Sequence, residues 1–316
     1  MTSITRSASG EVRLAADVAI AAQLACLIEA SAPKPGNVSP GRPFADLSYE
    51  DFLASAAAIG EPMAGAGTRP LGATVRLAVE ATARWTRSNS NLGIVLLLAP
   101  LARAAMADKG VGSLFPDGDA KKAPDPLIRA ALRRVLEETT IQDARNVYAA
   151  IRLAAPGGLG RVEAQDVADD PTKTLVDVMR LAADRDLIAC EYTTAFDLTF
   201  LTGVPALERA RGDALSWDDA VVETFLSLLA AAPDTHIVRR GGAAMAAEVS
   251  RQARAALAAG GVRSVAGRRA IDDMDRELRD AHHTANPGTA ADLTAAAIFV
   301  VLLGGGWHGG RDAASR

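Results

Sequence analysis

The sequence is poor in cysteine and in aromatic residues. Only two of its 316 residues are cysteine, and Phe, Trp and Tyr together make up 4%. Two cysteines are too few for a disulfide framework or a four-cysteine metal site. Both lie in apolar segments, so we expect Cys26 and Cys190 to be buried, reduced thiols. Such thiols are typical of a reducing compartment, and we predict a cytoplasmic protein.

Several motifs of well-known binding sites are also missing. The sequence contains no GxxxxGK[ST] loop and no GxGxxG between a strand and a helix, so the standard phosphate loops are excluded. It also lacks HExxH, CxxC and GxSxG, which excludes the commonest zinc-protease, redox and hydrolase signatures. It has no His-Asp dipeptide, which disfavours a helical metal-dependent phosphohydrolase. We expect His282 and His283 to form the polar end of a helix, without a metal role.

The distribution of charge and hydrophobicity excludes other partners. The net charge is -4 and no block of like charges occurs, so we expect no nucleic-acid partner. The most apolar runs, 92–102 and 295–303, are well short of the ~20 residues that cross a bilayer. Glu11 and Arg13 help to interrupt the N-terminal segment, which therefore lacks the apolar region of a signal peptide. We expect no membrane partner.

Alanine and leucine recur at helical spacing along nearly the whole chain. Hydrophobic residues make up 49% of it, which is enough for one large core. No run of alternating β-branched residues indicates a strand. We therefore predict an all-α fold, a single-domain multi-helix bundle of about a dozen helices. Its core should cover about 11–303, followed by a flexible Gly-rich tail over 304–316.

Helix-start patterns agree with this prediction. A Ser or Thr followed three residues later by Asp is typical of a helix N-terminus. The pattern occurs at Ser48, Thr140, Ser216 and Thr289, each time before an apolar periodic segment. The periodicity predicts helices over 11–31, 48–59, 70–87, 92–107, 125–138, 141–154, 171–183, 185–202, 205–211, 217–231, 243–259, 267–283 and 290–303, with exposed loops over 115–126 and 155–171.

The first polar cluster lies in EASAPKPGNVSPGRPFADL, after a long apolar helix. Pro33 and Pro35 stiffen the backbone on both sides of Lys34, and Gly36 allows conformations closed to other residues. A cation on a stiff backbone loses little entropy when it binds a phosphate. The alternative is an ordinary Pro/Gly connector whose lysine points to solvent.

The segment PDTHIVRRGG is the densest collection of polar chemistry. Asp234 could bind a metal or cap a helix, and Arg239 and Arg240 offer guanidinium forks. Gly241 and Gly242 would let the backbone approach a ligand closely. A surface arginine pair before a helix-ending Gly-Gly is the alternative.

Three further clusters lie at helix ends or within apolar helices. Asn89 and Asn91 could cap the next helix, or its N-terminus could receive a phosphate or a sugar hydroxyl. Asp186 and Glu191 do not share a helix face, since five residues turn about 140°, but either could be a buried Mg²⁺ ligand. Asp292 lies in a first helical turn, where it could simply complement the helix dipole.

Taken together, EASAPKPGNV, DTHIVRRGG and NPGTAADL, in this order, resemble the triphosphoribosyl-dephospho-CoA synthase family. The resemblance extends from about Glu11 to Leu303. It implies an all-α enzyme that joins ATP and 3'-dephospho-CoA with loss of adenine, while the triphosphate survives. Such chemistry asks for cations and Mg²⁺ on the triphosphate, carboxylates beside an oxocarbenium-like ribosyl group, and a base for the incoming hydroxyl.

The resemblance implies three groups of site residues. For binding the nucleotide it indicates Lys34, Gly36, Asn37, Asn89, Asn91, Arg239, Arg240, Gly241 and Gly242. For catalysis it indicates Asp46, Asp186, Glu191 and Asp292, and for the expected Mg²⁺ it indicates Glu29 and Asp234. Base and metal ligand are interchangeable among these acids at this stage.

Two departures indicate a divergent member. The family usually has His-x-Asp-Met where this chain has Phe44-Ala45-Asp46-Leu47, and Thr-His-Lys-Gly where it has Ser90-Asn91-Leu92-Gly93. A related ribosyl or phosphoribosyl transferase of another cofactor pathway, such as one-carbon pterin biosynthesis, is therefore an alternative. A non-catalytic nucleotide-binding homologue and a helical scaffold are others. We expect a nucleotide and a small-molecule acceptor as partners, and a homodimer if a second subunit covers a long apolar helix.

Overall fold

The structure, a computed structural model, describes residues 8–107, 125–280, 282–305 and 307. Within these ranges all regular elements are helices, apart from one isolated β-bridge between Ser39 and Arg42. The buried apolar side chains form one continuous cluster. The all-α prediction is confirmed.

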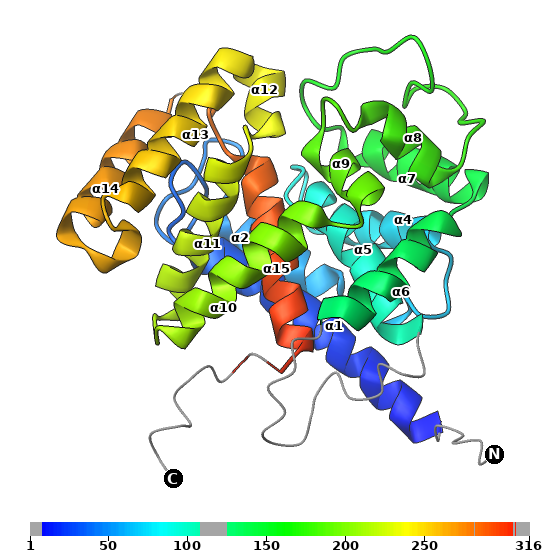
Figure 1. Ribbon diagram of the computed structural model, residues 1–316. Helices are drawn as coiled ribbons and strands as arrows, with labels where there is room; N and C mark the ends of the chain where they lie inside the picture. Colours follow the sequence, from blue (N-terminus) through cyan, green and yellow to red (C-terminus); the bar gives the residue numbers. More distant parts are fainter. Residues whose placement is uncertain (1–7, 108–124, 281, 306, 308–316) are drawn as a thin grey trace.

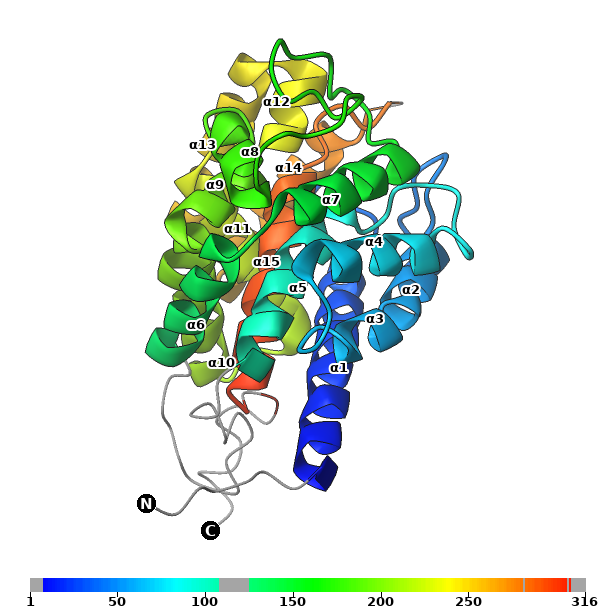
Figure 2. The ribbon, with the colours of Figure 1, turned by 90° about the vertical axis from the view of Figure 1, so that its right-hand side faces the viewer.

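The elements follow one another with short connections (Figures 1 and 2). They are α1 (Ala8–Ser31), α2 (Tyr49–Ala58), α3 (Gly60–Ala64), α4 (Leu71–Thr82), α5 (Leu92–Ala107), α6 (Asp125–Glu137), α7 (Ile141–Ala154), α8 (Leu175–Ala182), α9 (Leu187–Thr194), the π-helix η1 (Thr199–Gly203), α10 (Val204–Gly212), α11 (Trp217–Ala231), α12 (Thr235–Gly241), α13 (Ala243–Ala258), the 3₁₀-helix η2 (Gly261–Arg263), α14 (Val265–Leu278) and α15 (Gly288–Leu303).

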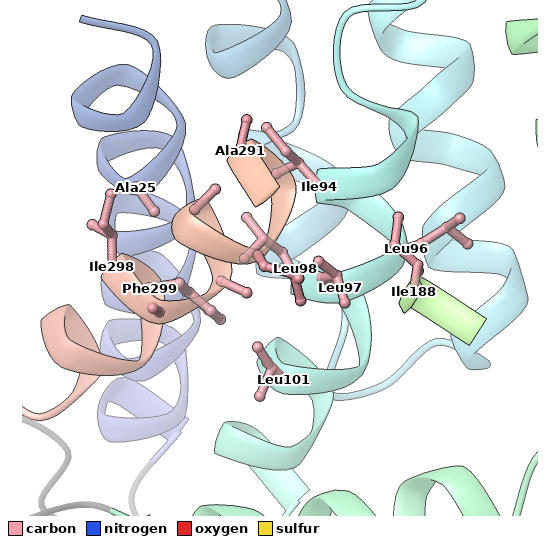
Figure 3. Packing of buried hydrophobic residues seen from close by; sticks show 14 of the residues in the cluster. Ala25, Ile94, Leu96, Leu97, Leu98, Leu101, Ile188, Ala291, Ile298 and Phe299 are labelled. Carbon is pink, nitrogen blue, oxygen red and sulfur yellow. The ribbon is translucent and has the colours of Figure 1, made fainter. Parts of the chain in front are cut away.

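Helix α15 is the centre of the bundle. Its sequence is apolar on all sides, and such a helix is stable only when neighbours surround it. Every residue from Leu293 to Leu303 is buried. Figure 1 shows α15 enclosed by other helices, and it contacts α1, α5, α10 and α11. Close up, Ile298 of α15 lies beside Ala25 of α1, and Leu98 of α5 faces α15 (Figure 3). The core therefore holds the two ends of the chain together.

Three of the four expected helix starts are confirmed. Ser48 and Thr140 each form a reciprocal capping box with the aspartate three residues later, and Ser216 accepts a hydrogen bond from the backbone of Asp219. The prediction for Thr289 is wrong, because α15 begins one residue earlier and Thr289 lies inside its first turn. The Thr289 hydroxyl instead accepts the backbone N–H of His236 at 3.1 Å, so it joins α15 to α12.

The predicted helix over 185–202 is interrupted. Ala195 and Phe196 adopt left-handed conformations, with φ of 52° and 65°, between α9 and the π-helix η1. The carboxylate of Glu191 accepts hydrogen bonds from the backbone of Leu198 and Thr199 and from the Thr199 hydroxyl. A buried carboxylate that gathers amide donors stabilises this break, which periodicity alone does not indicate. Helices α3 and α12 were not predicted either.

Two of the predicted loops differ in how far the structure describes them. The segment from Ala155 to Thr174 contains no helix, as expected for the 155–171 loop. The loop over 115–126 lies mostly outside the described residues, and so does most of the tail over 304–316.

Helix α1 is long and apolar enough, by length and composition alone, to cross a membrane over Leu14–Ser31. Helices α11 and α12, bent by 63°, pass the same test as a pair. Half of the Leu14–Ser31 window is buried within the protein, where α1 packs on α2, α3, α5 and α15. The absence of a membrane partner stays a prediction.

Leu97 and Leu127 form a matched pair for testing the core. Leu97 of α5 is fully buried, whereas Leu127 of α6 is 61% exposed. We expect Leu97→Ala to lower the free energy of unfolding by about 2–5 kcal/mol, because it leaves a cavity, and Leu127→Ala to change it by less than about 0.5 kcal/mol. Urea unfolding followed by circular dichroism measures both; equal losses would contradict this core.

Candidate functional site

A cavity of about 1140 Å³ opens between the central helices and the α7–α9 side of the bundle. All five polar clusters of the sequence contribute to its wall. The expected site residues that line it are Glu29, Asn37, Asp46, Asn89, Asn91, Asp186, Arg239, Arg240 and Asp292. The convergence of distant segments on one cavity is what the sequence patterns predicted.

The remaining expected residues do not line this cavity. They are Lys34, Gly36, Glu191, Asp234, Gly241 and Gly242. Glu191 stabilises the break after α9, and the positive φ of Gly242, 87°, lets α12 turn into α13. The other members of this group support residues of the wall from behind.

Lys34 is buried against Glu29. Its side chain is 1% exposed, and its Nζ lies 3.0 Å from Glu29 Oε1. The ammonium group also donates to the carbonyl oxygens of Glu29 and, at 3.3 Å, of Ala32. This differs from the expectation that Lys34 holds a phosphate, because its charge and its protons are used inside the protein. The rigid Pro-Lys-Pro corner instead fixes the Glu29 carboxylate, which does line the cavity.

Gly36 is needed for packing and not for the approach of a ligand. It has φ of +72°, and a Cβ at this position would lie 2.9 Å from the Cβ of Leu278. Its N–H donates to Asp275 Oδ1 at 2.8 Å, and Arg279 donates to the carbonyl of Asn37 at 2.6 Å. The turn after Lys34 is thereby clamped onto α14, which holds Asn37 in the wall.

Asp234 joins two helix N-termini. Its Oδ1 accepts the backbone N–H groups of His236 and Ile237, and its Oδ2 accepts that of Ala290 at 2.7 Å. Burial raises the pKa of Asp234 to about 6, although the three amide hydrogen bonds and Arg239 oppose the shift. Both carboxylate oxygens are occupied by amides of α12 and α15, so Asp234 caps a helix, and the alternative of a metal ligand loses support.

Arg239 and Asp186 form an ion pair in the cavity wall. Arg239 Nη1 lies 2.7 Å from Asp186 Oδ2, while Asp186 Oδ1 caps α9 by accepting the N–H of Ile188. The Nε of Arg239 has no partner among the described residues. Arg240 donates to the carbonyl of His282 at 2.8 Å. The two guanidinium groups are therefore partly fixed and retain donors for an anion.

Asp292 faces Gly93 across the cavity. A side chain at Gly93 would overlap Asp292 Oδ2, so only glycine fits beside this carboxyl group. Burial raises the pKa of Asp292 well above its ordinary value, and the negative charges of Glu29 and Asp234 raise it further. Glu29 is paired with Lys34 and Asp292 carries no cationic partner that overcomes burial. The two neighbouring carboxyl groups therefore differ in their tendency to hold a proton.

His236 is a site residue that the sequence analysis missed. Its Nδ1 lies 3.0 Å from the carbonyl oxygen of Asn286, and burial lowers its pKa to about 4. The imidazole is thus neutral at pH 7, with Nδ1–H donating to Asn286 and Nε2 left as an acceptor. The helix spacing of His236, Arg239 and Arg240 would have placed them on one face, had α12 been recognised.

Phe44 and His283 form a second part of the wall that the sequence did not reveal. Their rings stack with centroids 3.7 Å apart and an angle of 15° between the planes. Both rings line the cavity. Phe44 stands where the family pattern has a histidine, and His283 was expected at a polar helix end. The stack supplies a flat apolar surface in a chain that has few aromatic residues.

The described residues contain no group of three or more His, Cys, Asp or Glu side chains spaced to hold a metal ion. A protein cage for a cation is therefore absent from this part of the chain. Mg²⁺ in nucleotide sites takes most of its ligands from phosphates and water, with one or two protein oxygens. Asp46 and Asn91 line the cavity and fit this smaller requirement.

The Lys34–Glu29 pair can be tested by stability. We expect Lys34→Met to lower the free energy of unfolding by about 3–5 kcal/mol, because it leaves the Glu29 carboxylate buried without a partner. The double variant Glu29→Gln/Lys34→Met should recover most of this loss. Urea unfolding measures both variants. Unchanged stability together with weaker ATP binding would instead identify Lys34 as a phosphate ligand.

The neutral state of His236 predicts a dependence of stability on pH. The pKa is near 6.5 in the unfolded chain and about 4 in the folded one, so folding resists protonation and stability is lost as the pH falls between these values. We expect His236→Gln to lack this loss. Between pH 7 and pH 4 its free energy of unfolding should rise relative to the parent protein by up to about 3 kcal/mol. Parallel pH profiles in urea would contradict the assignment.

Comparison with known proteins gives a consistent result. The family model of ATP:dephospho-CoA triphosphoribosyl transferase matches residues 15–310. Proteins assigned as 2-(5''-triphosphoribosyl)-3'-dephosphocoenzyme-A synthase from Pseudomonas paraeruginosa and Pseudomonas aeruginosa are each 39% identical over 110 residues, which is 34% of this chain. The aligned region spans 37% of the length of these relatives.

A solved structure extends the comparison over most of the fold. The protein assigned as a triphosphoribosyl-dephospho-CoA synthase from Archaeoglobus fulgidus superimposes with a TM-score of 0.59 at 28% identity. The superposition covers 80% of this chain and 99% of the archaeal one. The family model covers most of the chain, and the motifs that carry the resemblance surround one cavity. The chain therefore belongs to the ATP:dephospho-CoA triphosphoribosyl transferase family.

Proposed function

We propose that this protein is a transferase that joins the triphosphoribosyl part of ATP to an acceptor such as 3'-dephospho-CoA and releases adenine. The observation that carries the proposal is the composition of one cavity, which combines an arginine pair, two unlike carboxyl groups and a neutral histidine. Family membership and the names of the relatives support it.

Arg239 and Arg240 bind the triphosphate in this proposal. Guanidinium groups stay charged at all relevant pH values and match phosphate oxygens with paired N–H donors. The ion pair with Asp186 fixes the Arg239 side chain before the nucleotide arrives. Asp46 and Asn91 would hold a Mg²⁺ ion, which neutralises phosphate charge when bound.

Glu29 and Asp292 act at the ribosyl group. Departure of adenine leaves positive charge on the sugar, and a carboxylate fixed beside it lowers the energy of that state. Glu29 suits this role because Lys34 holds its position. Asp292 retains its proton, so it can donate it to a ring nitrogen of the leaving adenine. The differing environments of the two groups support this division.

His236 accepts the proton of the incoming hydroxyl group. Its Nδ1–H is fixed on the Asn286 carbonyl, which leaves the Nε2 lone pair for the acceptor. A general base of this kind contributes roughly 10²–10⁴ to the rate. The C–N bond to adenine breaks, the new C–O bond forms, and the two protons move to adenine and to His236 respectively.

A related transferase with another acceptor is the second candidate. The observation that favours it is the Phe44–His283 stack, where the family pattern has a histidine in place of Phe44. A flat acceptor ring, such as that of a pterin, would suit this surface. We retain a cytoplasmic location and a homodimer as further proposals. The reduced state of Cys26 and Cys190 supports the first, and the 52% exposure of Ile20 on α1 supports the second.

The reaction is tested by release of adenine from ATP in the presence of Mg²⁺ and 3'-dephospho-CoA, followed by chromatography. We expect Asp292→Asn to lower kcat by about 10²–10⁴, since the amide keeps the shape of a neutral acid but has no proton to transfer. Arg251→Ala, on the exposed face of α13, serves as the control and should keep full activity. Absence of adenine release by the unaltered protein would refute the specific reaction, and release with a pterin acceptor alone would establish the second candidate.

A further inference from the structure

The cavity is larger than one nucleotide requires. Pockets for single small ligands typically measure about 300–1,000 Å³, whereas this one measures about 1140 Å³. The groups assigned to ATP come from α1, α12 and α15. The opposite side of the cavity is built from α7, α8 and the loop that connects them, and the proposed reaction leaves the side chains there without a role.

Three arginines line this opposite side. Arg152 ends α7, Arg161 lies in the 155–174 loop and Arg185 precedes α9. The Nη1 of Arg152 donates to the carbonyl of Val167 at 2.6 Å, and that of Arg185 donates to the carbonyl of Leu181 at 3.0 Å. Backbone oxygens thus orient two of the guanidinium groups without neutralising their charge. They remain available to an anion.

The nearest acidic side chain is committed to the loop itself. Asp166 accepts the backbone N–H groups of Ala168 and Val162, each at 2.8 Å, and these bonds together with Arg161 lower its pKa. Arg185 lies close enough to Tyr148 to lower the pKa of its phenol, although burial raises it more. Positive charge from three separate segments is therefore gathered on one side of the cavity.

Three leucines lie among these arginines and are unusually exposed. Leu153, Leu159 and Leu181 are 50%, 43% and 45% exposed, and all three line the cavity. An exposed apolar surface of this kind marks a place where a ligand packs. Cations mixed with leucines suit a ligand that carries phosphate and a long, weakly polar chain together.

The loop also touches the nucleotide side. Gly158 has φ of +80°, and a Cβ there would lie 3.2 Å from the carbonyl oxygen of Arg239. Figure 2 shows the loop between α7 and α8 beside α12. A ligand held by the loop would therefore lie next to the triphosphate site, as an attacking group must.

We propose that Arg152, Arg161 and Arg185, with Leu153, Leu159 and Leu181, form a separate subsite that binds the phosphate groups and the extended arm of the acceptor. We call these six residues the acceptor wall. The inference rests on the proposed transfer to a phosphorylated acceptor and adds the place and the chemistry of acceptor binding. The acceptor class is a phosphodiester or pyrophosphate joined to a flexible, partly apolar chain.

The test compares two ligands on one triple variant. Arg152→Gln/Arg161→Gln/Arg185→Gln is titrated calorimetrically with 3'-dephospho-CoA alone and with ATP and Mg²⁺ alone. We expect the Kd for 3'-dephospho-CoA to rise about 10- to 100-fold, because three charge contacts are lost, while the Kd for ATP changes less than about twofold. Arg239→Gln/Arg240→Gln should show the reverse order.

The matched control is Arg145→Gln/Arg180→Gln. These arginines lie on α7 and α8 but outside the cavity, in exposed ion pairs, so both Kd values should stay unchanged. Equal weakening of both ligands by the triple variant, an unchanged Kd for 3'-dephospho-CoA, or no binding of it by the unaltered protein would each overturn the acceptor wall. These readouts are independent of turnover. Binding as expected without adenine release would refute the proposed reaction and leave the subsite standing.

Discussion

The site depends on the three hydrogen bonds that Asp234 accepts. They join the start of α12, which carries His236, Arg239 and Arg240, to the start of α15, which carries Asp292. A buried carboxylate is costly unless donors surround it, and here the exposed amides of two helix N-termini supply them. The same bonds therefore satisfy both helix ends and set the distance between the phosphate-binding and ribosyl-binding groups.

A second fixed point lies behind the opposite wall. The corner around Lys34 places a buried ammonium against Glu29, and Gly36 clamps the following turn onto α14. Removing either partner of a buried ion pair is far more disruptive than its net contribution suggests. The polar residues in the family motifs thus form two layers, one that lines the cavity and one that positions the first. Motif membership alone does not distinguish the layers.

Much of the fold was predictable because it follows from local chemistry. Apolar periodicity located most helices, and the Ser48 and Thr140 capping boxes involve residues only three positions apart. The π-helix after Phe196 and the short α12 were missed, since both depend on carboxylates that bind amides from other parts of the chain. Similarly, the neutrality of His236 results from burial by neighbours that lie far away in sequence.

The sequence by itself determined the helical class, the central apolar helix and the set of segments that would carry polar chemistry. These properties depend on composition and on spacing along one chain segment, which sequence displays directly. Only the tertiary structure decided which polar residues face the cavity. Lys34 turned inward because Glu29 lay within its reach, Asp234 was claimed by amides of α15, and Arg152 and Arg161 came to face Arg239 across the cavity. Such choices depend on burial and on partners distant in sequence, and therefore on the completed packing of the helices.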